Sequence, residues 1–119
     1  MGLLHGLDLR GHRYGMIGMA DWSMYPLLHP GSLVLIDESR RKVVSTGWAN
    51  ELERPIYFLE ARDGYRCGWF TAAAGKLIYQ PHPASGLVPE TFAIVDVDLI
   101  GQVTGVAMRL ERRPLPARS

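Results

Sequence analysis

The sequence predicts one domain that is mainly β. Short runs rich in branched and aromatic residues, the densest at residues 55–60, are typical of strands. Turn residues such as those at 62–64 separate these runs, as expected between antiparallel strands. Pro26 and Pro30 lie close together and allow at most about one turn of helix between them. A chain of 119 residues is long enough to bury a single hydrophobic core.

The amino-terminal part is predicted to contain a lead-in, two strands and a rigid turn. Residues 1–15 contain four glycines and no clear period, so we expect a lead-in arm or the end of a linker. Residues 16–20 are apolar and punctuated by glycine, which predicts a strand that leads to Ser23. A turn fixed by Pro26 follows, and the apolar run at residues 33–36 predicts a buried strand. Ser23 is therefore expected on a rigid corner.

The middle of the chain predicts a surface loop and an antiparallel meander. Residues 38–54 are polar and charged, which favours an excursion over the surface. The three strands of the meander are expected at residues 55–60, 65–71 and 76–80. Two prolines within residues 81–86 exclude a regular strand and predict a corner on the surface.

The carboxy-terminal part predicts a closing strand and a tail. Residues 92–97 favour a strand or bend, and residues 99–110 favour a long strand with bends or bulges at Gly101 and Gly105. Residues 111–119 contain two prolines and three arginines, which is typical of a flexible tail. The predicted domain therefore spans residues 16–110.

Composition excludes several classes of function. The net charge of +1 is too near balance for the basic surface of a nucleic-acid-binding domain. The longest apolar run, at residues 33–36, is far too short for a membrane span or a signal peptide. A single cysteine, Cys67, excludes an internal disulfide and offers no metal cluster. We therefore expect a cytoplasmic protein without a membrane anchor, metal or cofactor.

The segment around Ser23 resembles the nucleophile segment of the LexA/phage-repressor/UmuD family of self-cleaving serine peptidases. Bacterial signal peptidases share the catalytic core of that family. The resemblance is carried by Ser23, Met24, Pro26, Leu28, Gly31 and the strand that ends in Asp37.

Three later segments match the same family in order. Residues 57–70 resemble the hairpin whose second strand carries the general-base lysine of the family. Residues 77–83 resemble the strand and Asn-Pro corner that follow, with His82 at the asparagine position, and residues 100–106 resemble the closing strand. The resemblance covers most of the chain and implies a LexA-like domain of short, strongly bent antiparallel strands.

The catalytic lysine of that family has no counterpart here. Its position falls on Cys67 or Gly68, and Arg66 stays protonated and cannot act as a base. Lys42 falls in the predicted surface loop and Lys76 at a hairpin end. The Ala-Gly or Cys-Gly bond that the family cuts is also missing before the serine. These departures predict a pseudo-peptidase that retains the fold.

The residues around the predicted cleft have both a functional and a structural interpretation. Ser23 is a candidate nucleophile or a turn serine that caps a short helix. The tryptophans fit a ligand pocket or core packing, Cys67 fits an inert buried thiol, and the histidines are more often surface residues. The cleft candidates beside Ser23 are Asp21, Trp22, Met24, Trp69 and His82.

The resemblance implies a regulatory and dimerisation domain of a bacterial transcriptional regulator. DNA would be bound only through a separate helix-turn-helix domain upstream. An exposed terminal strand is expected to pair with its copy in a homodimer, through Val103, Val106, Met108 and Leu110.

Two alternatives remain open from the sequence. One is an active self-cleaving peptidase that uses Ser23 with a non-standard base, such as His82. The other is an effector sensor, in which the vacated cleft binds a small molecule or a peptide.

Overall fold

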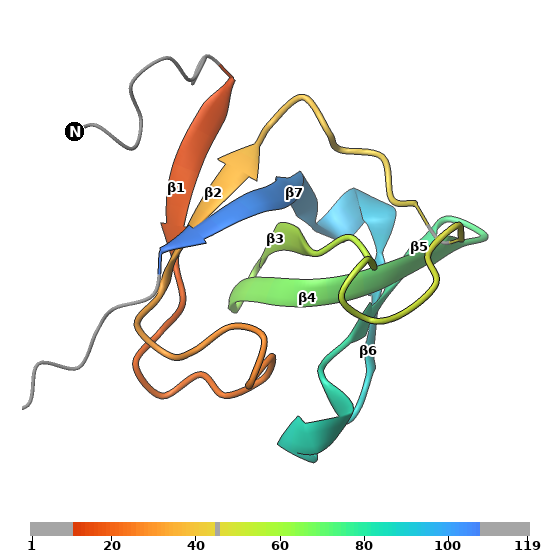
Figure 1. The fold of residues 1–119 in the computed structure, drawn as a ribbon. Coiled ribbons are helices and arrows are strands. Elements are labelled where there is room, and N and C mark those ends of the chain that lie inside the picture. Colours follow the sequence, from red (N-terminus) through yellow and green to blue (C-terminus); the bar gives the residue numbers. More distant parts are fainter. Residues whose placement is uncertain (1–10, 45, 108–119) are drawn as a thin grey trace, which may run out of the picture.

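The computed structural model describes residues 11–44 and 46–107. Seven antiparallel strands form one sheet in the order β1-β2-β7-β3-β4-β5-β6, and the described residues contain no α-helix (Figure 1). The prediction of a mainly β domain is confirmed. The strands are β1 (His12–Met16), β2 (Leu33–Asp37), β3 (Tyr57–Ala61), β4 (Gly64–Ala73), β5 (Lys76–Gln80), β6 (Glu90–Ala93) and β7 (Asp98–Ala107), with 3₁₀ turns η2 (Pro83–Ser85) and η3 (Ile94–Asp96).

The sheet bends because its two longest strands change partners along their length. The first half of β4 pairs with β3 and its second half pairs with β5. Likewise, β7 pairs first with β3 and then with β2. The register of β7 shifts beside Gly101 and Gly105, which confirms the predicted bulges. A Cβ on Gly101 would lie 2.3 Å from the carbonyl oxygen of Asp37, so only glycine permits this approach of β2 and β7.

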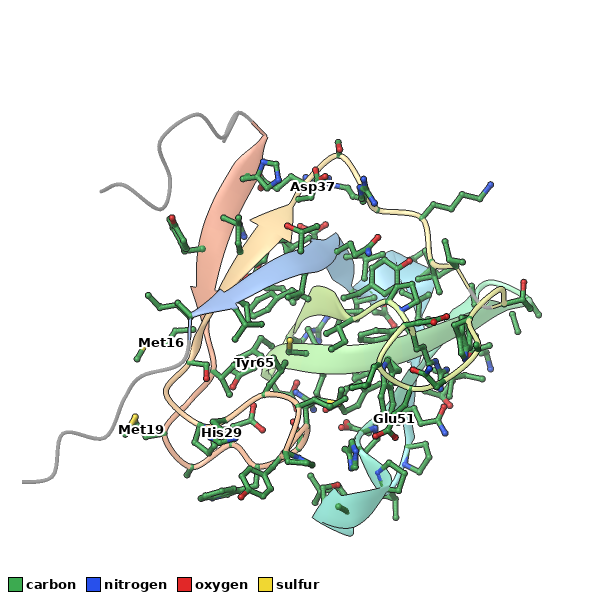
Figure 2. All side chains as sticks on the ribbon, in the orientation of Figure 1. Met16, Met19, His29, Asp37, Glu51 and Tyr65 are labelled. Atoms are coloured by element: carbon green, nitrogen blue, oxygen red, sulfur yellow. The ribbon has the colours of Figure 1, made fainter. Side chains whose placement is uncertain are left out.

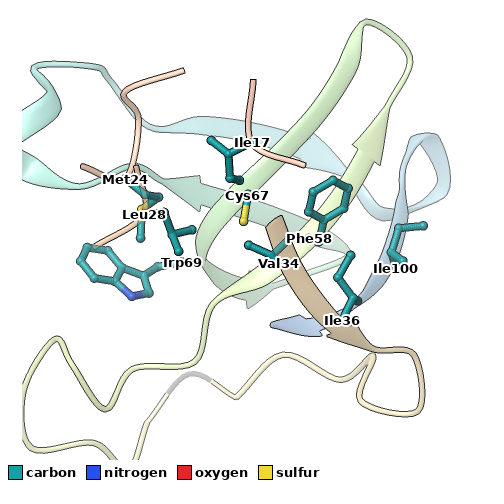
Figure 3. Close-up of a cluster of buried hydrophobic side chains, with 9 residues drawn as sticks. All are labelled: Ile17, Met24, Leu28, Val34, Ile36, Phe58, Cys67, Trp69 and Ile100. Atoms are coloured by element: carbon teal, nitrogen blue, oxygen red, sulfur yellow. The ribbon is translucent and has the colours of Figure 1, made fainter. Parts of the chain in front are cut away.

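The bend creates two hydrophobic clusters. The larger cluster lies between the loop that carries Ser23 and the strands of the sheet (Figure 3). It consists of Ile17, Met24, Leu28, Val34, Ile36, Phe58, Cys67, Trp69 and Ile100. The second cluster is built on Tyr57, Leu59, Phe70, Leu77 and Tyr79. Burial of these side chains, at about 1.5–3 kcal/mol each, is the main force that holds the sheet in its bent form.

The first strand lies earlier in the chain than predicted. β1 covers His12–Met16 and pairs with β2, whereas the prediction placed a strand at residues 16–20. The chain leaves the sheet after Ile17, whose N–H donates to the Ser32 carbonyl, and turns where Asp21 N–H donates to the Gly18 carbonyl. Part of the expected lead-in is thus a strand, and residues 1–10 and 111–119 lie outside the described part.

The predicted terminal strand is enclosed over only part of its length. Strand β7 pairs with β3 as far as Gln102 and with β2 from Gln102 to Ala107, so Val103 and Val106 pair with Ile36 and Val34 on one edge. Among the described residues, no strand pairs with the other edge of residues 104–107. Met108 and Leu110 lie outside the described residues. Within the described residues, no helix is long and apolar enough to cross a membrane.

Candidate functional site

Ser23 lies at the centre of a tight loop between β1 and β2. Its backbone N–H donates to Asp21 Oδ1 at 2.9 Å, and its carbonyl accepts the N–H of His82 at 2.8 Å. The turn that follows spans residues 24–28 and is closed by the hydrogen bond from the Leu28 N–H to the Met24 carbonyl at 3.0 Å. Ser23 is 8% exposed. These hydrogen bonds hold it on the corner that the sequence predicts.

A pocket of about 240 Å³ lies beside Ser23. Its wall comes from the Ser23 loop, β4, β5, β6 and the segment before β6. The lining residues are Asp21, Ser23, Tyr65, Arg66, Cys67, Tyr79, Leu87 and Glu90. The structure therefore brings together Ser23, Asp21 and Cys67, three of the residues singled out from the sequence.

Asp21 organises the polar side of the pocket. Tyr65 Oη donates to Asp21 Oδ2 and accepts the Gly18 N–H at 2.8 Å, so the tyrosine ties the loop to β4 (Figure 2). Burial alone would raise the pKa of the Asp21 carboxyl, but hydrogen bonds from Ser23 and Tyr65 hold that pKa below its ordinary value. Burial and the bond to Asp21 raise the pKa of Tyr65. At neutral pH the carboxylate is ionised and the phenol is neutral.

Tyr79 occupies the space beside Gly68, one of the two positions at which the family lysine would fall. A Cβ on Gly68 would lie 2.6 Å from Tyr79 Cε1 and 3.2 Å from Met24 Sδ. The Tyr79 hydroxyl donates to the Cys67 carbonyl at 3.4 Å. Burial is the main reason that the pKa of Tyr79 is raised to about 12, so the phenol is a poor base near pH 7.

Cys67, the other position, is fully enclosed. It is 1% exposed, and burial raises the pKa of its thiol, with a further contribution from the negative charge of Asp21. A thiolate is the reactive form of cysteine, so this environment disfavours a nucleophile or base at Cys67.

Arg66 belongs to an ion-pair network on the rim of the pocket. Its Nε and one terminal nitrogen contact the two oxygens of Glu90 at 2.8 and 2.9 Å, and it also binds Asp63 at 3.1 Å. The bond to Glu90 is the first cause that raises the pKa of the Arg66 guanidinium. Arg66 therefore stays charged and cannot take a proton from Ser23.

Three other predicted cleft residues lie outside the pocket wall. Trp22 is 55% exposed, and its ring packs against Tyr25 with the centroids 5.1 Å apart. Met24 and Trp69 are buried in the larger hydrophobic cluster. Lys42 and Lys76 are exposed, and no lysine is among the described residues that line the pocket.

His82 is buried, at 8% exposure, and the expectation of a surface histidine is wrong here. Its Nδ1 accepts the Ala84 N–H at 3.0 Å, so in the neutral ring Nε2 carries the proton and faces Glu51 at 3.3 Å. The ring also packs on Trp69, with centroids 5.6 Å apart. These contacts give His82 a structural role, whereas His29 is exposed, as expected.

The sequence interpretation missed Tyr65, Tyr79 and Glu90 as members of the site. The available signal was a glycine in the middle of an aromatic strand, because Gly68 leaves a space that a large neighbour must fill. Among the described residues, no group of three or more His, Cys, Asp or Glu side chains is placed to hold a metal ion.

No protein-family model matches this chain, and no curated protein sequence matches it.

Proposed function

We propose that this chain is a non-catalytic LexA-like regulatory domain of a bacterial transcriptional regulator, in which Ser23 belongs to a binding pocket. The observation that carries the proposal is the Gly68–Tyr79 contact, because the tyrosine ring fills the space where a basic side chain would have to reach the serine. The resemblance around Ser23 supports the family and the cytoplasmic location. Binding of DNA is assigned to a separate upstream domain.

The hydrogen bonds of Ser23 support an inactive serine. A serine nucleophile needs an adjacent neutral base that accepts its proton. Here Asp21, held in its ionised form, accepts the backbone N–H of Ser23 at 2.9 Å. A carboxylate with a lowered pKa is a weak base, so Ser23 is held in place without being activated.

The proposal of a homodimer is supported by the resemblance alone. Among the described residues, β3 flanks β7 only as far as Gln102, so the edge of residues 104–107 that faces away from β2 is one surface on which a copy of the chain could pair. Sedimentation velocity over a range of concentrations tests the dimer, and a strictly monomeric chain at high concentration would remove this part of the proposal.

An active peptidase is the competing function. Incubation of the chain with a mixture of unrelated peptides between pH 7 and 10, followed by mass spectrometry, separates the two. We expect no cleavage that depends on Ser23. Cleavage by the parent chain that disappears in Ser23→Ala would contradict the proposal.

A further inference from the structure

We propose that the Ser23 pocket binds a primary ammonium group, carried either by a small amine or by a lysine side chain of a partner. This inference rests on the proposed function, because it treats the pocket as a binding site. The pocket is lined by the carboxylates of Asp21 and Glu90 and by the guanidinium of Arg66. The lining therefore carries one more negative than positive charge.

The single cation of the lining has four of its five N–H donors engaged within the protein. Arg66 makes two bonds to Glu90 and one to Asp63, and its remaining terminal nitrogen donates to the Tyr65 carbonyl at 3.0 Å. The two parallel hydrogen bonds between Arg66 and Glu90 form a strong bidentate pair, which a weakly bound anion would have to break. Most of the remaining hydrogen-bonding capacity of the pocket is acceptor positions on carboxylate and hydroxyl oxygens.

The charge of Asp21 acts on the neutral acids that line the pocket. Burial is the first cause that raises the pKa of Tyr65, Cys67 and Tyr79, and the charge of Asp21 adds to the rise in all three. Glu90 adds to the rise for Tyr79. The negative charges that disfavour ionisation of these acids would stabilise a positively charged ligand.

The size and rim of the pocket limit the rest of the ligand. A volume of about 240 Å³ is below the range of drug-sized sites, so only a few non-hydrogen atoms fit. Leu87 lies on the rim and is 58% exposed, which offers an apolar contact for a short alkyl chain. A linear alkylammonium, free or at the end of a lysine side chain, meets both requirements.

Titration with n-butylammonium, n-butanol and butyrate tests the charge requirement. The three probes share the alkyl chain, and binding is followed by amide chemical shifts of the full chain. We expect saturable binding of the ammonium at millimolar concentration and at least tenfold weaker binding of the alcohol and the acid. Equal binding of the three probes, or no saturable binding of the ammonium, would overturn the proposal.

Two variants locate the binding site. Asp21→Asn and Glu90→Gln each remove one pocket charge and should weaken butylammonium binding at least fivefold. Glu90 is the safer of the two for folding, because its side chain lies on the edge strand β6. Asp96→Asn, at an exposed position outside this pocket, should bind as the parent does. Unchanged binding in both pocket variants would overturn the proposal.

Two peptides distinguish the sources of the ammonium group. They are acetyl-Ala-Lys-Ala-amide and the same peptide with acetyl-lysine. Binding of the first peptide at least tenfold more tightly than butylammonium, with loss on acetylation, assigns the site to a partner's lysine. Equal or weaker binding assigns it to a free amine. Ser23-dependent cleavage of either peptide would contradict the proposed function, whereas absence of ammonium binding would contradict only this inference.

Discussion

The Tyr79 ring fills the space beside Gly68, and we propose that this contact keeps a basic side chain away from Ser23. We predict that Gly68→Ala lowers the free energy of unfolding by about 1–3 kcal/mol, because the new methyl group overlaps the buried Tyr79 ring. Urea unfolding followed by tryptophan fluorescence measures the change.

Gly105→Ala is the matched control for this prediction. It also places a methyl group on a strand glycine, but the nearest atom, Leu35 Cβ, lies at an ordinary contact distance of 3.6 Å. We expect a change within about 0.5 kcal/mol. If Gly68→Ala were as stable as Gly105→Ala, the packing of Tyr79 over Gly68 would be refuted.

Asp21 is predicted to stabilise the fold in its ionised form. Because its pKa is lower in the folded chain, its contribution is complete above about pH 4 and is lost as the pH falls through the folded value. Asp21→Asn should therefore lower stability by about 1–3 kcal/mol at pH 7, and the difference from the parent should shrink toward pH 2.

Unfolding curves between pH 2 and 7 measure this dependence. Asp96→Asn controls for the general effect of removing an exposed carboxylate. A gap between parent and Asp21→Asn that stays constant down to pH 2 would show that the role of Asp21 does not depend on its charge.

At the scale of elements, the loop over residues 38–54 is held against β4 by one arginine. Arg54 Cζ lies 4.9 Å from the ring centre of Trp48 and 5.3 Å from that of Trp69. Each such contact is worth about 0.5–2 kcal/mol. We predict that Arg54→Ala lowers stability by about 1–3 kcal/mol and makes Trp48 more accessible.

Quenching of tryptophan fluorescence by acrylamide measures that exposure. Arg62→Ala serves as the control, because Arg62 is exposed at the hairpin between β3 and β4. Equal quenching in the parent and in Arg54→Ala would show that the stack does not hold the loop.

The meander of β3, β4 and β5 could be predicted from the sequence because its signals are local. Dense strand-forming residues and turn residues such as Asp63-Gly64 specify each hairpin within a few positions. The end of β1 and the interior place of β7 could not be predicted in this way, because they depend on pairing with β2 across the whole chain.

The candidate site shows the same division between local and distant signals. The rigid corner around Ser23 follows from Pro26 and Pro30, which act on their own neighbours. The contact of Tyr79 with Gly68 and the burial of His82 arise between segments far apart in sequence. No periodic pattern records such contacts, so they could not be predicted from the sequence.

At the scale of the whole molecule, we propose that the bent β domain holds Ser23 on a rigid corner without a base that could activate it. Intact mass measured over time on the full chain, from neutral to alkaline pH and beside Ser23→Ala, tests this claim most directly. Alkaline conditions favour deprotonation of any base near the serine. We predict that both chains keep their full mass at every pH. Two fragments that appear in the parent and not in Ser23→Ala would show that the domain is a self-cleaving peptidase.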